Sequence, residues 1–198
     1  MMLYKAENQP LKSLSCADAY TQANQLAAAL REMGITKGDR VVSYMPNRPE
    51  TIIALLAVAS IGAVWSSCAP DFGAQSVLDR FTQIEPTVLF AVDGYDYGGK
   101  TFDRREVVAT LQHRLPTLQA TILVPHISAD DDALQNTRLW DDVLSSAHPP
   151  ESMPFEAVPF DHPLWVLYSS GTTGLPKPIV QGHGGITLEH AKSTALHN

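Results

Sequence analysis

Four Ser and Thr hydroxyls, two glycines and one lysine fall within residues 168–177, which run Tyr-Ser-Ser-Gly-Thr-Thr-Gly-Leu-Pro-Lys. A loop of this composition offers closely spaced backbone N–H groups, rotatable O–H donors and one long cation. These are the groups that hold a polyphosphate in proteins. Gly171 and Gly174 would let the backbone take φ > 0 and approach a ligand closely. The residue types and their order therefore predict a phosphate-binding loop.

Two familiar nucleotide-binding patterns are absent from the chain. There is no Gly-x-x-x-x-Gly-Lys-[Ser/Thr] and no Gly-x-Gly-x-x-Gly after an expected strand. A P-loop nucleotide hydrolase is therefore a weak alternative, which phosphate release from ATP without any carboxylic acid would revive. A plain polar turn between two strands is the other alternative for this loop, because Ser and Thr side chains also cap turns locally.

The loop resembles the phosphate-binding signature of the adenylate-forming superfamily of acyl-CoA synthetases, peptide-synthetase adenylation domains and luciferases. The resemblance runs from about residue 13 to residue 198. Its flanks are more similar to the acetoacetate–CoA ligase branch than to the acetate branch. The flanking residues are Pro178 after the lysine, Leu-Pro-Lys-Pro-Ile-Val-Gln-Gly-His-Gly-Gly over 175–185, Trp-Ser-Ser-Cys-Ala-Pro-Asp-Phe-Gly over 65–73, and Asp-His-Pro-Leu-Trp over 161–165.

The resemblance implies a ligase that activates a small carboxylic acid in two steps. Acetoacetate attacks the α-phosphorus of ATP to form an acyl-adenylate and pyrophosphate, and the thiolate of coenzyme A then displaces AMP. Mg²⁺ would bridge the phosphates. Another short-chain acid is an open alternative, since later segments of the family build most of the acid pocket.

The resemblance also implies that machinery lies outside these residues. In the family, later segments supply the adenine pocket, a magnesium carboxylate, a ribose-binding aspartate and a mobile C-terminal lid with a catalytic lysine. We therefore expect residues 1–198 to be a partial N-terminal AMP-binding domain without the lid domain. The missing C-terminal part of the same enzyme is a candidate partner. A truncated, catalytically inactive nucleotide-binding fragment is the alternative.

Each loop residue has an expected role. Thr172 and Thr173 would donate hydrogen bonds to β- and γ-phosphate oxygens, and Lys177 would neutralise charge on the departing pyrophosphate. A solvated lysine at a strand edge is the alternative for Lys177. The remaining phosphate-binding candidates are Ser169, Ser170, Gly171 and Gly174.

Other polar residues are weaker candidates. His183 lies between two glycines that would leave its surroundings open, and by resemblance it lies near the acyl or nucleotide pocket; a structural histidine is the alternative. His190 adds too few ligands for a metal site. A further set could line the same sheet face, although core packing and turn formation explain it adequately: Trp65, Ser66, Ser67, Cys68 and Asp71. Asp93, Asp96 and Asp103 do not have EF-hand spacing, so we expect a solvated turn there and a surface loop at 130–132.

Composition excludes several classes of protein. The chain is 44% apolar and 18% charged, which are globular values. A formal net charge of −7 without a basic cluster argues against binding to nucleic acid or to an anionic membrane. Cys16 and Cys68 predict neither a disulfide framework nor a zinc site. The N-terminus has no signal-peptide pattern, and the apolar segment 52–59 is too short to span a bilayer. A cytoplasmic protein is expected.

Strands alternate with helices along the chain. Strands are expected at 40–45, 63–68, 87–92, 120–124, 164–168 and 179–181. Helices are expected from Ser15 to Gly34 with a capping box to Asp18, at 50–61, around 77–84 and 108–115, at 139–144 and from 186 to 196. This order favours an α/β fold with a mostly parallel sheet and helices on both faces. The signature loop then follows the carboxyl end of a strand, where ligands bind in such sheets. The proline-rich residues 148–163 form a candidate seam between two lobes.

Overall fold

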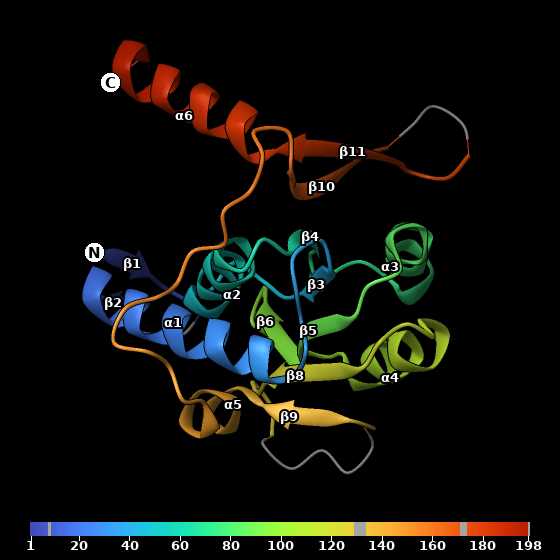
Figure 1. Ribbon diagram of the computed structural model, residues 1–198. Helices are drawn as coiled ribbons and strands as arrows, with labels where there is room; N and C mark the ends of the chain where they lie inside the picture. Colours follow the sequence, from blue (N-terminus) through green and yellow to red (C-terminus); the bar gives the residue numbers. More distant parts are fainter. Residues whose placement is uncertain (8, 129–133, 171–173, 198) are drawn as a thin grey trace.

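A seven-stranded sheet organises the protein, whose computed structural model describes residues 1–7, 9–128, 134–170 and 174–197. Neighbouring strands are parallel except β10 and β11, which form an antiparallel hairpin. The mostly parallel α/β sheet predicted from the sequence is therefore confirmed (Figure 1). The strands in spatial order are β11 (Lys177–Gly182), β10 (Pro163–Ser169), β4 (Val64–Cys68), β3 (Arg40–Tyr44), β5 (Val88–Val92), β8 (Ala120–Val124) and β9 (Thr137–Leu139).

Helices cover both faces of this sheet. One face packs against α1 (Cys16–Glu32), α2 (Pro49–Ser60) and α5 (Trp140–Ser146). The other packs against α3 (Ala74–Phe81), the 3₁₀ turn η1 (Thr82–Ile84) and α4 (Arg105–Arg114), and Figure 1 shows α3 and α4 on the opposite side of the sheet from α1. Because side chains alternate along a strand, a sheet buried on both faces needs apolar residues at nearly every position. This explains the continuous apolar run of β5, all five residues of which are buried.

Local signals set the ends of the first two long helices. The Ser15 hydroxyl caps α1 by accepting the amide hydrogen of Asp18 at 3.0 Å, as expected, and it also donates to the Asp18 carboxylate at 2.6 Å. Gly34 follows the end of α1 with φ of +86°. Pro49 begins α2, where its missing N–H costs no helical hydrogen bond.

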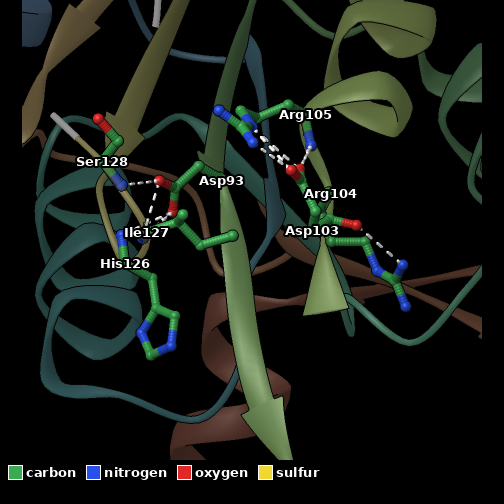
Figure 2. A network of polar contacts seen from close by, with 7 residues as sticks. All are labelled: Asp93, Asp103, Arg104, Arg105, His126, Ile127 and Ser128. Atoms are coloured by element: carbon green, nitrogen blue, oxygen red, sulfur yellow. Dashed lines mark hydrogen bonds and ion pairs between the residues drawn. The ribbon is translucent and has the colours of Figure 1, made fainter. Parts of the chain in front are cut away.

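Several short elements were not predicted. They are β1 (Met2–Tyr4) paired with β2 (Lys12–Leu14), the hairpin of β6 (Gly94–Tyr97) and β7 (Lys100–Asp103), and β9 at the sheet edge. The expected solvated turn around Asp93 is wrong, because Asp93 is fully buried. Its carboxylate accepts hydrogen bonds from three consecutive backbone amides, residues 126–128, which replace water (Figure 2). The loop expected at 130–132 lies outside the described residues.

A long connection joins α5 to β10. Between residues 147 and 162 it contains neither helix nor strand, as expected, and it runs along α1 and α2. Asn24 donates to the Pro150 carbonyl oxygen at 2.8 Å, and the amide of Glu156 donates to the Ser60 carbonyl oxygen at 2.8 Å. The candidate seam at 148–163 is thus an extended strap, and a division into lobes there stays a prediction.

The C-terminal part of the chain lies at one end of the molecule in Figure 1, where β10 pairs with β4. There β10 and β11 lie beyond β4, and α6 (His183–His197) leads away from β11 toward the C-terminus. Among the described residues, no helix has the length and apolar character required to cross a bilayer.

Candidate functional site

The signature loop follows the carboxyl end of β10, beside the carboxyl ends of β4 and β3. Trp165 and Val166 pair in parallel with Trp65 and Ser66, and β4 pairs in parallel with β3. The segments after these three strands therefore leave the sheet at the same edge. In open α/β sheets this is the edge at which ligands bind.

The sheet register places the two ends of the loop opposite each other. Ser169 is the last residue of β10 and pairs with Lys177, the first residue of β11. Ser170, Gly174 and Lys177 are exposed, and Gly174 has φ of +90°, the left-handed backbone predicted from its type. Gly171, Thr172 and Thr173 lie outside the described residues. The structure thus brings Ser169 and Lys177 together, and their role toward a phosphate remains a prediction.

The segment after β4, residues 69–73, is held at the same edge by the side chains of Tyr44 and Arg104. The Tyr44 hydroxyl, at the end of β3, lies 2.7 Å from the carbonyl oxygens of both Pro70 and Phe72. Burial raises the pKa of Tyr44, so this hydroxyl remains a donor at any physiological pH. Arg104 donates from Nε to the same Pro70 carbonyl oxygen at 2.6 Å. This segment therefore has a defined backbone position next to the signature loop.

The candidate residues in β4 and in the segment after it divide between core and surface. Trp65 is buried and lies 6.2 Å from Phe90, ring centroid to ring centroid. Ser66 donates to the Val166 carbonyl oxygen at 2.7 Å, which ties β4 to β10. Burial raises the pKa of the Cys68 thiol to about 12, so it stays a neutral thiol at neutral pH. Ser67 and Asp71 are exposed at the edge of the sheet.

Arg80 links the segment after β4 to Tyr168, the residue before the signature loop. Its guanidinium carbon lies 4.9 Å from the centre of the Phe72 ring and 5.9 Å from that of Tyr168. The Tyr168 hydroxyl donates to the Arg80 carbonyl oxygen at 2.7 Å, and burial raises the pKa of Tyr168 to about 12. Arg80 therefore contacts the loop region through both its side chain and its backbone.

His183 lies at the other end of the β10–β11 hairpin from Lys177. Pro163 pairs with Gly182 at that end, and about six residue steps at 3.3 Å each separate it from the loop. The His183 ring lies 5.7 Å from the His162 ring, centroid to centroid, and burial, with the neighbouring imidazole, lowers its pKa. Within the described ranges its Nε2 is buried without a hydrogen-bond partner.

The glycine after His183 does not open its surroundings. A Cβ on Gly184 would lie 2.2 Å from the Phe160 ring, so this glycine is required for close packing. His190 lies beside Trp165, with ring centroids 6.5 Å apart. No cluster of three or more His, Cys, Asp or Glu side chains suited to a metal ion occurs in the part of the chain that the structure describes.

Sequence reasoning missed three residues at this edge, namely Tyr44, Arg80 and Arg104. Each acts on a backbone carbonyl or ring between 8 and 88 positions away, so no local motif marks it. The available signal was indirect. Tyr44 ends an apolar strand at the edge where a ligand is expected, and a polar group there needs a partner.

Comparison with known proteins adds a sequence and a structural match. The family model described as "AMP-binding enzyme" matches residues 4–196. The chain is 44% identical to the acetoacetyl-CoA synthetase of Rattus norvegicus over 183 residues, 89% of this chain and 27% of that protein. It is 43% identical to the acetoacetyl-coenzyme A synthetase of Rhizobium meliloti over 202 residues, 99% of this chain and 30% of that protein.

The solved structure of acetoacetyl-CoA synthetase from Streptomyces lividans superposes with a TM-score of 0.92 at 52% identity. That match covers 98% of this chain and 29% of the solved one. The chain therefore spans less than a third of the length of these relatives.

Proposed function

Because the chain belongs to the AMP-binding enzyme family, we propose that it forms the triphosphate-binding part of an acid–thiol ligase that activates acetoacetate. The single observation that carries this proposal is the edge of the sheet where β10 ends, because its register sets Ser169 and Lys177 at the two ends of a Ser/Thr/Gly loop. The acid is suggested by the names of the relatives, which are acetoacetyl-CoA synthetases.

The proposed reaction has two group transfers and no covalent enzyme intermediate. A carboxylate oxygen of acetoacetate forms a bond to the α-phosphorus of ATP, and pyrophosphate leaves with the electron pair of the broken P–O bond. The thiolate of coenzyme A then attacks the acyl carbon and AMP leaves. Catalysis of such steps depends on positioning and on stabilisation of developing charge.

Each loop residue has a part in holding the triphosphate. The Lys177 ammonium would offset charge on the departing pyrophosphate, and its exposed position at the start of β11 leaves it free to reach a ligand. Mg²⁺ would bridge phosphate oxygens and keep most of its waters, as it usually does. The remaining phosphate-binding residues of the proposal are Ser169, Ser170, Gly171, Thr172, Thr173 and Gly174.

A second candidate function is nucleotide binding without chemistry. It is favoured by one observation, that the chain spans 27–30% of the length of the relatives. The remainder of such an enzyme would then be the partner that supplies catalysis. Under either candidate we propose a cytoplasmic setting and no nucleic-acid partner.

The test is exchange of radiolabelled pyrophosphate into ATP in the presence of Mg²⁺ and acetoacetate. We expect exchange that Lys177→Ala lowers by about 100-fold, the effect of removing one group that stabilises transition-state charge. Lys192→Ala is the matched control, because this exposed lysine pairs with Glu189 on α6. Acetate and butyrate in place of acetoacetate test the choice of acid.

The outcomes separate the candidates. If pyrophosphate exchange is as fast in Lys177→Ala as in the wild type, the proposed phosphate-binding role of the loop is contradicted. Absence of exchange, combined with ATP binding that Lys177→Ala weakens, supports the second candidate. Absence of both contradicts nucleotide binding by this chain.

A further inference from the structure

One short helical segment contacts the chain on both sides of the signature loop. This segment, residues 74–84, consists of α3 and η1. Before the loop, the Tyr168 hydroxyl donates to the carbonyl oxygen of Arg80 at 2.7 Å. After the loop, Nε2 of Gln83 donates to the carbonyl oxygen of Pro176 at 2.9 Å. The two contacts span 88 and 93 positions of sequence, so neither follows from local chain geometry.

The donor atom of Gln83 is itself fixed in place. The same Nε2 lies 2.7 Å from the carbonyl oxygen of Asp79, four residues earlier. A primary amide carries two hydrogens, so one can serve each carbonyl. The carbonyl of Asp79 belongs to the last turn of α3, whose end leaves carbonyls without helical partners. The contact to Pro176 is therefore made by a side chain that is already oriented.

The peptide that accepts this hydrogen bond joins Pro176 to Lys177. Fixing its carbonyl fixes the plane of the peptide that ends in the Lys177 nitrogen. On the other side, Tyr168 directly precedes Ser169, the partner of Lys177 in the hairpin. The Arg80 guanidinium further contacts the rings of both Phe72 and Tyr168. Together these contacts define where both ends of the loop lie relative to the sheet edge.

We propose that Gln83 is a positioning residue for the signature loop and that it acts with the hydroxyl of Tyr168. The inference rests on the proposed function, in that the loop is taken to hold a nucleoside triphosphate. Gln83 does not touch the ligand. It keeps the carbonyl of Pro176 in place, so that the Lys177 side chain starts from a fixed point and less ordering remains when ATP binds.

The test compares two glutamines of the same helical segment. Gln83→Ala removes the donor to Pro176. Gln75→Ala is the matched control, because Gln75 is also exposed but donates to the Asp79 carboxylate at 2.6 Å, within its own helix. Gln83→Glu keeps the shape of the side chain without its hydrogens, and Gln83→Lys supplies a donor of similar reach.

Two measurements are made on the intact chain. The first is hydrogen exchange at the amides of Gly174, Leu175 and Lys177 without ligand. The second is the dissociation constant of Mg²⁺-ATP by calorimetry. We expect Gln83→Ala and Gln83→Glu to raise both the exchange rate and the dissociation constant roughly three- to tenfold, the equivalent of one hydrogen bond. Gln75→Ala should match the wild type in both measurements. Gln83→Lys should reverse at least half of the increase in the exchange rate and in the dissociation constant.

The failures are distinguishable. If the wild-type chain binds no Mg²⁺-ATP, the proposed function is contradicted, and hydrogen exchange alone then decides whether Gln83 orders the loop ends. If the wild type binds but Gln83→Ala behaves like Gln75→Ala in both measurements, the positioning role is wrong. If Gln83→Glu matched the wild type in both measurements, the positioning role would also be wrong. A carboxylate packs like an amide of the same shape but cannot donate the hydrogen bond.

Discussion

Asp93 shows at the scale of one residue how a buried charge organises the edge of the sheet. Its carboxylate accepts the amide hydrogens of His126, Ile127 and Ser128 at 2.6, 2.9 and 2.8 Å (Figure 2). Its own carbonyl oxygen accepts the amide of Arg104 at 2.7 Å. Arg104 in turn holds the segment after β4 through the Pro70 carbonyl. Asp93 therefore supports the candidate site from the neighbouring strand without facing it.

We predict that Asp93→Asn lowers the free energy of unfolding by about 3 kcal/mol. The amide keeps one acceptor oxygen but turns an N–H₂ toward backbone N–H groups, and hydrogen bonds to a charged group are worth about 1.5–3 kcal/mol each. Urea denaturation measures the change. Asp103→Asn is the control, since this exposed carboxylate pairs with Arg105 and should cost less than about 1 kcal/mol. Equal effects of the two substitutions would contradict the argument.

At the scale of elements, sequence patterns predicted what depends on local signals. The strand predicted at 120–124 has the same bounds as β8, and the helix predicted from Ser15 begins where its cap places it. The short strands β1, β2, β6, β7 and β9 have three or four residues each, too few to show a period. Their formation depends on pairing partners that a linear pattern does not reveal.

The same distinction between local and long-range signals applies to the candidate site. The loop was predicted because its hydroxyls, glycines and lysine are consecutive in sequence. The groups that hold its ends, such as Gln83 and the backbone of Arg80, could not be predicted, because their partners lie 93 and 88 positions away, respectively. For His183, neighbouring glycines indicated open space, whereas in the fold Gly184 packs directly on Phe160.

The junction between β11 and α6 is an element whose stability should depend on pH. His183 is the first residue of α6, and its amide donates to the His162 carbonyl oxygen at 3.0 Å. Burial and the adjacent His162 ring lower the pKa of His183 below its usual 6.5. A positive charge at a helix N-terminus is also unfavourable, because the helix dipole is positive there. Folding therefore favours the neutral imidazole.

The sign of the pH effect follows from proton binding. Below about pH 6.5 the unfolded chain binds more protons at His183 than the folded chain does, so the free energy of unfolding falls as pH decreases through that range. We predict that the free energy of unfolding, measured by urea denaturation, falls less between pH 7.5 and pH 5.5 for His183→Gln than for the wild type. His113→Gln, at an exposed position on α4, should lose as much as the wild type does. A loss that is unchanged in His183→Gln would show that this imidazole is not responsible.

At the scale of the whole molecule, apolar side chains are unevenly distributed. The sheet and the helices on its two faces bury most of their large apolar residues, as Val42, Leu89 and Ile122 do completely, although Ile52 and Leu56 on α2 are exposed. On β11 and α6, by contrast, Val180 is 59% exposed and Leu188 is 61% exposed. We predict that another polypeptide covers these exposed apolar groups on the neighbouring elements β11 and α6. The remaining length of the relatives supplies a candidate for that polypeptide.

We predict that this surface binds the remainder of the Streptomyces lividans acetoacetyl-CoA synthetase when that segment is added in trans. Hydrogen exchange at the α6 amides should be fast in the free chain, because a helix with exposed apolar residues opens locally at little cost in free energy. The added segment should slow it about tenfold or more at a concentration ten times the dissociation constant. Leu188→Glu should abolish the protection, whereas His113→Glu on α4 should retain it. Protection that persists in Leu188→Glu would place the contact elsewhere, and exchange unchanged by the added segment would mean that β11 and α6 do not bind it.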